Sequence, residues 1–563
     1  MKETFRLSML WLHTWAGVVI GSLLFIIFWM GTLSVFNHDI DRWMMPDTRI
    51  QPPETFSYDA FAEEVGDLLP EGIQEWGLIT PRDRVPMAFL YHRDSTGTFG
   101  QRITLDLAQN TPIPDQGTHA GTGFIFPFHF SLHIGWKGIG YWIVGAAAMA
   151  MMLLLVTGVI IHARILKDFF TFRPGKKLPR STLDLHNLSG VLVLPFHFMI
   201  ALSGVILFMN IYFPQAADLA YGEEEVPRTA FFDEAYSSYT RPATGEPLEE
   251  PFSIDAMVAT ATAAWDGIPP YYVRVINPGD ANSYVYVRRS YQDHVLFDRD
   301  IFFFDAGTGE VLHHFVTEPI MTAQHFLVGF HIIQFDHWGL RWLYFLAGLA
   351  GCILIGTGFI YWLEKRRKKH EELGLKGLRI VETLTIGSVT GIIAATVVFF
   401  VINRILPLGF ELAGIERAIL EIIVFYVFWI GTFAHAWARR GRAWSDQLWV
   451  TAVLSVAAVV LNALTTGDHM IQTAIDGQWN VFGMDALLLI TAVLCVVIAR
   501  RLDRKAKAVP AEETAVPAKA PPARVAARPL ADLTEGDGAP PTGDGAPAAP
   551  IEFPTTAQQP NDT

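Results

Sequence analysis

The sequence predicts a polytopic α-helical membrane protein with about eight transmembrane helices, two external α+β modules and a disordered C-terminal tail. Three observations carry this prediction. The chain of 563 residues is 51% hydrophobic and only 17% charged, whereas a soluble domain carries about 25% charged residues. Its apolar residues form eight long runs, and residues 1–370 contain a repeat.

Each of the eight runs is long enough for a helix that crosses a bilayer core about 30 Å thick. The runs cover residues 13–36, 139–162, 187–210, 339–362, 381–402, 417–437, 447–465 and 482–499. A signal peptide is the alternative for the first run. That run is too long and lacks a small-residue cleavage site, so we expect a retained helix.

The distribution of basic residues predicts the orientation. Lys and Arg cluster after the second, fourth, sixth and eighth runs, whereas the short loop 466–481 has neither. Basic loops stay on the cytoplasmic side of a membrane, so we expect both termini in the cytoplasm and the long polar segments in a periplasm. The net charge of −14 argues against a nucleic-acid partner, since a phosphate-binding surface is basic.

The two external segments share one pattern. Each opens with a capping serine, Ser57 or Ser253, before a helical stretch. Strand signals follow at 87–91 and 284–287, rich in aromatic and apolar residues. The expected divisions are 1–211 (first repeat, with a module at about 40–130, and third helix), 212–337 (second module), 338–370 (fourth helix), 371–504 (four C-terminal helices) and 505–563. The last segment is too poor in apolar residues to fold and is expected to be a disordered tail.

A repeat relates the first run to the third and the second to the fourth. Leu12–Val18 aligns with Leu185–Val191, and Gly31 with Gly204, at an offset of 173 residues. Thr157–Ile160 aligns with Thr357–Ile360 at an offset of 200. Both copies run in the same direction, so the sequence predicts four helices related by a pseudo-twofold axis along the membrane normal.

Histidines at matched depths predict haem binding. An ionisable side chain inside a membrane is costly and marks a functional site by default. His13 and His186 occupy the same repeat position, so the axis would bring them to one depth on opposite sides. Haem iron takes two axial ligands on opposite faces, and imidazole is a common one. This pair is the expected inner site, for which His162 is a competitor.

The expected outer site is less regular. His133 and His331 precede the second and fourth runs, with repeat registers that differ by two residues, and His129 lies one helical turn from His133. A zinc site is the alternative for this outer cluster, although zinc commonly adds cysteine or carboxylate to a set of four ligands. Other histidines at helix ends, such as His38 and His469, are better explained as membrane-boundary residues.

His197 predicts a ligand at a second depth on the third run. It lies eleven residues after His186, which is about 16 Å along a helix and nearly on the same face. Pro195 predicts a kink beside it. The stripe favours two haems. Glycines crowd these runs, either for close helix packing or to make room for a flat cofactor.

The motifs of the repeat resemble the PepSY-associated transmembrane family over roughly residues 1–370, and both external modules look like PepSY domains. The resemblance rests on Leu12-His13-x-x-x-Gly17, Phe128-His129-Phe130-Ser131-Leu132-His133-x-Gly135, Leu185-His186-Asn187-Leu188-Ser189-Gly190 and Thr357-Gly358-Phe359-Ile360-Tyr361-Trp362. It implies a bacterial inner-membrane protein, often linked to iron uptake, and some members are di-haem ferric-siderophore reductases.

The resemblance further implies b-type haem held by His13, His133, His186 and His331, while His197 looks like a feature of a longer subgroup. We therefore expect electron transfer across the lipid bilayer, through two haems, to a periplasmic ferric siderophore. The chain has no GxGxxG after a strand and no GxxxxGK[ST], so a quinol or a separate reductase is the expected donor.

The four C-terminal runs exceed what a minimal four-span reductase needs. They are expected to hold a quinone or a partner subunit. Glu421 inside them is either a proton or quinone site or an interhelical hydrogen-bond partner. Two other classes remain open: a transporter, with which a parallel repeat is compatible, and a regulatory binding protein of the PepSY type.

Overall fold

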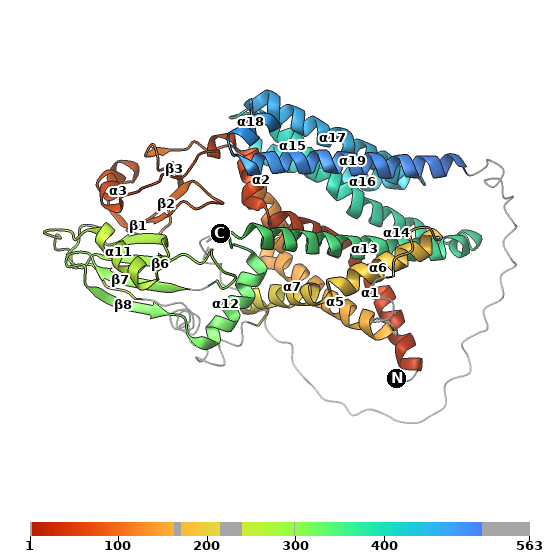
Figure 1. Ribbon diagram of the computed structural model, residues 1–563, viewed down its shortest axis with the longest axis horizontal. Coiled ribbons are helices and arrows are strands. Elements are labelled where there is room, and N and C mark those ends of the chain that lie inside the picture. The colour runs from red at the N-terminus through yellow and green to blue at the C-terminus, as the bar shows by residue number, and fades with distance from the viewer. Residues whose placement is uncertain (1–2, 163–170, 214–238, 298, 509–563) are drawn as a thin grey trace, which may run out of the picture. The chain divides into compact units, whose positions relative to one another are not determined.

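The computed structural model describes residues 3–162, 171–213, 239–297 and 299–508 (Figure 1). It confirms the predicted fold class. Within those residues, seven helices are long and apolar enough to cross a membrane, or eight if one bent pair counts as a span. The spans are α1 (Glu3–Ser34), α5 (Ile139–Ile161), the bent pair α6 (Leu178–Leu192) and α7 (Leu194–Leu207), α13 (Trp338–Glu372), α14 (Gly377–Ile386) with α15 (Ile392–Ile405), α16 (Arg417–Ala438), α17 (Ala443–Thr466) and α19 (Trp479–Ala508).

The end of the last helix and the bend of the third span can be compared with the sequence prediction. The helix α19 continues to Ala508, so the expected tail at 505–563 begins as helix, and the rest of it lies outside the described residues. The third span is not one helix: α6 and α7 meet at an angle of 65°. Pro195 cannot donate a backbone hydrogen bond to the preceding turn, and Val193 between the two helices leaves the helical conformation. The predicted kink is confirmed.

The first four spans form a bundle. The helix α1 packs against α5 and α13, α5 packs against α7, and α6 packs against α13. A cluster of buried apolar side chains fills the space between them, including Leu24 on α1, Met151 on α5, Ala201 on α7 and Leu354 on α13. The two helices of the first repeat, α1 and α5, are therefore neighbours, as are α6 and α13 of the second repeat, and contacts of α1 with α13 and of α5 with α7 join the two repeats.

The two external modules are joined in one sheet. Its eight antiparallel strands follow the order β4-β3-β2-β1-β5-β6-β7-β8. The central pair, β1 with β5, joins the modules, with Gly77 opposite Arg274. The strands are β1 (Ile73–Ile79), β2 (Ala88–Asp94), β3 (Ile103–Asp106), β4 (Thr111–Pro112), β5 (Pro270–Ile276), β6 (Tyr284–Arg289), β7 (Asp300–Asp305) and β8 (Val311–Val316).

One helix from each module covers the same face of the sheet: α3 (Tyr58–Glu64) and α11 (Ile254–Ala264). Ser57 and Ser253 cap them, each accepting a hydrogen bond from a backbone amide of the first turn, as the sequence predicts. The caps are also exchanged between modules. Asp255 accepts from the Tyr58 amide at 2.8 Å, and Asp59 accepts from the Ile254 amide at 2.6 Å.

Shorter elements connect the sheet to the bundle and the C-terminal helices to one another. They are α2 (Asn37–Met44), η1 (Pro46–Thr48), η2 (Val65–Leu68), η3 (Ala120–Ile125), α4 (Phe126–Ser131), η4 (Trp136–Gly138), α8 (Met209–Tyr212), α12 (Pro319–Ile332), η5 (Gly387–Gly391), β9 (Glu411–Leu412), β10 (Ile415–Glu416) and α18 (Met470–Ile475). Of these, α12 packs against α7 and lies between the sheet and the bundle (Figure 1).

Candidate functional site

The structure brings His13 and His186 together at one end of the bundle. Their ring centroids lie 6.3 Å apart and their planes cross at 79°. Each ring is held by the neighbouring helix: His13 Nδ1 lies 3.0 Å from the Leu154 carbonyl oxygen, and His186 Nδ1 lies 2.8 Å from that of Leu354. The two leucines occupy the same repeat position, so the two contacts are symmetry-related.

These contacts determine the tautomer. A carbonyl oxygen only accepts, so Nδ1 must carry the proton and Nε2 must carry the lone pair. A metal-binding histidine commonly donates its second nitrogen to a backbone carbonyl in this way. Two metal–nitrogen bonds of about 2 Å on opposite sides of one metal would place the imidazole centroids roughly 6 Å apart. The 6.3 Å separation of the inner pair therefore matches the separation expected of two opposed ligands.

Glycines lie against both rings. A Cβ atom at Gly158 would lie 3.4 Å from His13 Cε1, and one at Gly358 would lie 3.2 Å from His186 Cε1. The two glycines again occupy one repeat position. Each of these glycines leaves room for the imidazole ring of the neighbouring helix.

A cavity of about 800 Å³ opens beside the inner pair. Its volume lies within the range of small-molecule and cofactor sites. Both histidines line it, and so do three basic side chains, Arg6, Lys365 and Arg366. The rest of the lining is mostly apolar, and its aromatic residues and glycines include Trp11, Trp15, Gly17, Gly21, Gly190, Phe359 and Trp362. His162, the competitor for the inner site, also lines the cavity.

The second pair consists of His129 on α4 and His331 on α12. Their ring centroids lie 6.0 Å apart, with 23° between the planes. His129 Nδ1 lies 2.9 Å from the Ile27 carbonyl oxygen, and His331 Nδ1 lies 3.0 Å from Ser203 Oγ. Ser203 donates its own proton to a carbonyl oxygen, so it accepts from His331. Both outer rings therefore also keep Nε2 unprotonated.

The outer pair repeats the arrangement of the inner one. Cβ atoms at Gly31 and Gly204 would lie 2.6 Å and 2.8 Å from the Cε1 atoms of His129 and His331. Gly31 and Gly204 match at the offset of 173 found in the sequence. On α1, His13 and Gly31 are 18 residues apart, which separates the two pairs by about 27 Å along the helix.

His133 does not lie opposite His331. Its Nε2 lies 2.8 Å from the Phe124 carbonyl oxygen and its Nδ1 lies 3.0 Å from the hydroxyl of Tyr426 on α16. The α4 helix ends before it, and both Leu132 and His133 have positive φ. The chain therefore turns His133 toward the C-terminal helices. The ring beside His331 is instead that of His129, which in the sequence prediction is only a neighbour of His133.

His197 is fully buried near the middle of the bundle. Its Nε2 lies 3.1 Å from the Ala347 carbonyl oxygen on α13, so His186 and His197 both face α13, as the predicted stripe requires, despite the bend between them. The rings that neighbour His197 belong to Phe28 and Phe196. In the described part of the chain, it has no opposed imidazole.

Two buried arginines connect the sheet to the outer pair. Arg84, in the loop after β1, donates to the carbonyl oxygens of Ile333 at 2.8 Å and Val35 at 3.3 Å. Arg341 pairs with Asp39 and also donates to Val35. Burial lowers the pKa of Arg84 to about 9. Ile333 is the C-cap of α12, so Arg84 binds the end of the helix that carries His331.

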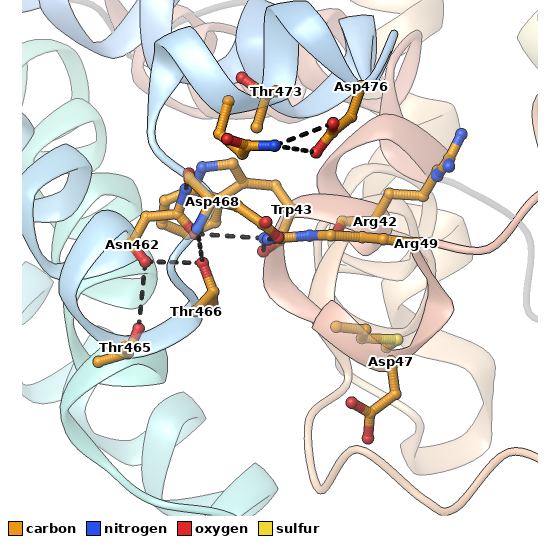
Figure 2. A network of polar contacts seen from close by, with 12 residues as sticks. Arg42, Trp43, Asp47, Arg49, Asn462, Thr465, Thr466, Asp468, Thr473 and Asp476 are labelled. Atoms are coloured by element: carbon orange, nitrogen blue, oxygen red, sulfur yellow. Dashed lines mark hydrogen bonds and ion pairs between the residues drawn. The ribbon is translucent and has the colours of Figure 1, made fainter.

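The C-terminal helices attach through a second polar network (Figure 2). Arg49 forms an ion pair with Asp468 and donates to the Trp43 carbonyl oxygen at 2.7 Å and to Asn462 Oδ1 at 3.2 Å. Trp43 in turn donates from its indole to Asp485 on α19 at 2.8 Å. The network ties the segment after α1 to α17, α19 and the loop between them.

Glu421, predicted as a proton or quinone site or a hydrogen-bond partner, makes contacts of the second kind. It accepts hydrogen bonds from Asn403 at 3.0 Å and from Thr118, and it pairs with Arg417 at 3.1 Å. The carboxylate joins α15, α16 and the segment before η3. Among the described residues, no cluster of three or more His, Cys, Asp or Glu is arranged to hold a metal ion.

Together these features define a polytopic membrane protein in which two helix–module–helix repeats build one bundle with an imidazole pair at each of two levels. The profile of the PepSY-associated TM region matches residues 10–365, which contain both repeats. The chain belongs to this family. It is also similar to an uncharacterized protein of Pseudomonas aeruginosa, with 26% identity over 393 residues that cover 65% of this chain and 91% of that protein.

Proposed function

We propose that this protein carries electrons across a bacterial inner membrane through two b-type haems, one at each imidazole pair, and delivers them to ferric iron in the periplasm. The observation that supports the proposal most strongly is the repeated arrangement of four histidines. Each ring donates a hydrogen bond from Nδ1 to a neighbouring helix and lies against a glycine of the bundle. Its centroid lies about 6 Å from that of a second imidazole.

In this proposal, His13 and His186 hold the inner haem, and His129 and His331 hold the outer one. Haem supplies one-electron redox chemistry. The hydrogen bonds of Nδ1, to carbonyl oxygens for His13, His186 and His129 and to the Ser203 hydroxyl for His331, fix the orientation of each imidazole and increase its basicity toward iron. Three basic side chains line the inner cavity: Arg6, Lys365 and Arg366. They would offer positive charge to the carboxylates of a haem. With His13 and His186 at one site and His129 and His331 at the other as its ligands, a haem at each site would pass electrons and bind no further ligand.

Electrons enter the inner site from a quinol or from a separate reductase. The proposed acceptor is a ferric chelate of the siderophore class. The proposed orientation, with both termini in the cytoplasm and the sheet in the periplasm, is supported by the basic loops, since such loops stay on the cytoplasmic side. The C-terminal helices hold the segment after α1 through Arg49 and Trp43 and are the proposed contact for a donor or for a quinone.

The test is a reduced-minus-oxidised absorption spectrum of the purified, detergent-solubilised chain, with haem counted per protein. We expect two b-type haems. His186→Ala and His331→Ala should each remove about half of the haem absorbance, from different sites, because a bis-imidazole site loses one of its two ligands. A colourless protein that is otherwise folded would refute the proposal.

The same measurement separates His129 from His133. His129→Ala should remove the outer haem, whereas His133→Ala should retain both, since His133 bonds Phe124 and Tyr426. His469→Ala, in a residue that caps α18, is the matched control outside the bundle. Retention of haem in His129→Ala and its loss in His133→Ala would reverse the assignment of the outer ligand.

A further inference from the structure

A second cavity, of about 400 Å³, lies at the seam between the two modules. Its walls come from both copies. The loop after β1 supplies Thr80, Arg82 and Asp83, and the second module supplies Tyr271 and Ser290. The volume is at the lower end of the range for small-molecule sites, which suits a compact ligand or one that is partly enclosed.

The seam cavity is connected to the helix of one outer histidine. Asp336 lines it and is five residues from His331, a separation that the chain can extend to at most about 18 Å. Arg82 and Asp83 also line the cavity, and the next residue, Arg84, donates to the carbonyl oxygen of Ile333 at the end of α12. A molecule in the cavity would therefore sit beside the helix that carries one of the two outer histidines.

The charged side chains that line the cavity are mostly acidic: Glu54, Asp83 and Asp336, with Arg82 as the lining cation. Arg84 and Arg341 act on Asp336 from outside the lining. Asp336 Oδ1 is buried and accepts no hydrogen bond within the described residues, and burial raises the pKa of this carboxyl. A buried carboxylate oxygen without a donor is costly, and a cationic or hydrogen-bonding ligand would satisfy it.

The surrounding modules have the same sign. Residues 40–130 contain 13 Asp and Glu against 6 Lys and Arg, and residues 239–337 contain 13 against 5. An acidic surface with an acidic cavity repels anions and concentrates cations near the opening. Without the four charged residues that line the cavity, the counts are still 11 against 5 and 12 against 5, so the excess of acidic residues does not depend on the cavity lining.

We propose that the seam cavity binds the electron acceptor and that it selects a neutral or cationic ferric chelate over a polyanionic one. The inference rests on the proposed function, because an acceptor is needed only if electrons reach the outer site. One electron passes to each ferric ion, which becomes ferrous, and no covalent bond of the chain changes. A hydroquinone donor releases two electrons and two protons and so reduces two ferric ions.

The test uses gallium(III) chelates, which resemble the ferric complexes but are not reduced. Binding to the full-length, haem-loaded chain in detergent is measured by equilibrium dialysis with gallium quantified in each chamber. We expect a cationic trihydroxamate complex to bind at least about tenfold more tightly than a polyanionic tricatecholate complex, because two excess carboxylates act at short range. Added salt should reduce the difference.

Variants locate the binding. Asp336→Asn and Asp83→Asn should each weaken binding of the cationic chelate by about fivefold. Asp83 is exposed, so its substitution tests the charge with little risk to folding. Asp67→Asn, in an exposed acid of η2 outside the cavity, is the control and should have no effect.

The possible failures are distinguishable. Equal binding of the tricatecholate complex, or unchanged binding in both cavity variants, would overturn the seam assignment while the haem spectrum of the same sample remains intact. A sample that binds the cationic chelate but contains no haem would support the cavity and refute the proposed electron transfer.

Discussion

Glycine-to-alanine substitutions test the close contact between each histidine and its neighbouring helix. In Gly204→Ala, the new Cβ would lie 2.8 Å from His331 Cε1, against an ordinary contact that begins at 3.4 Å. The ring must therefore move by about 0.6 Å. Overpacking costs about 1–3 kcal/mol, and a weakened bond to Ser203 adds about 1 kcal/mol. The helix propensity of alanine returns about 1 kcal/mol, so we expect a net loss of about 1–3 kcal/mol.

Gly431→Ala is the matched control, because nothing lies within 4 Å of its added Cβ. This variant should be unchanged or more stable by up to about 1 kcal/mol. The assay is thermal unfolding of the purified chain in detergent, with absorbance of any bound haem recorded in parallel. The distances also predict a ranking of damage, with Gly31→Ala at 2.6 Å worst, then Gly204→Ala, and Gly158→Ala at 3.4 Å mildest. Equal stability of Gly204→Ala and Gly431→Ala would refute the reasoning.

Three further predictions concern the sheet and the C-terminal helices. Asp255→Ala and Asp59→Ala each remove an exchanged helix cap and should cost about 1–2 kcal/mol in chemical unfolding of the chain; unchanged unfolding midpoints would contradict this. Backbone amides, led by that of Thr244, lower the pKa of Asp280 to about 2, so its stabilising effect is present above its unfolded pKa and is lost as pH falls toward 2. Asp280→Asn should therefore be less stable than the wild type at pH 7 and equal to it near pH 2, and a constant difference would be the contrary result. Trp43→Phe leaves a buried carboxylate of α19 without its indole donor and should cost about 1–3 kcal/mol, measured by thermal unfolding; a variant as stable as the wild type would show that the bond contributes nothing.

The repeat explains why the inner pair was predictable. Two offsets read from the sequence placed His13 and His186 at equivalent positions, and in the structure their partners, the carbonyls of Leu154 and Leu354, are equivalent as well. The position of a residue along its helix determines its depth in the membrane, and the equivalence of the two copies determines which sides of the bundle the two histidines occupy. The prediction that His13 and His186 lie close together therefore required no knowledge of the loops. The eight runs were predictable for the related reason that a helix in lipid must satisfy its own backbone and present an apolar surface.

The outer pair was harder to predict because it depends on turns. His129 and His133 are one helical turn apart, and helical periodicity alone places them on one face. The α4 helix ends at Ser131, and the left-handed backbone of Leu132 and His133 turns the second histidine away. A chain with positive φ at two consecutive residues without glycine is uncommon, and nothing in the residue types signals it. The mutual capping by Asp59 and Asp255 was also missed, since it exists only once the two modules share a sheet.

The C-terminal helices contact the two repeats differently. They pack on α1 and α2 of the first repeat and on α13 of the second, and Trp29 on α1 donates to Thr396 on α15 at 3.0 Å. By the offset of 200, His133 corresponds to Ile333, which also has a positive φ. In the second copy, that position receives Arg84 at its carbonyl oxygen, whereas in the first copy the side chain reaches Tyr426. The same left-handed turn thus binds Arg84 from the loop after β1 in the second repeat and Tyr426 of the C-terminal helices in the first. His13 and His186 keep the symmetry of the repeat at an offset of 173 residues, whereas His129 and His331 are 202 residues apart and so differ by two from the offset of 200. His133 departs from the symmetry where the C-terminal helices bind.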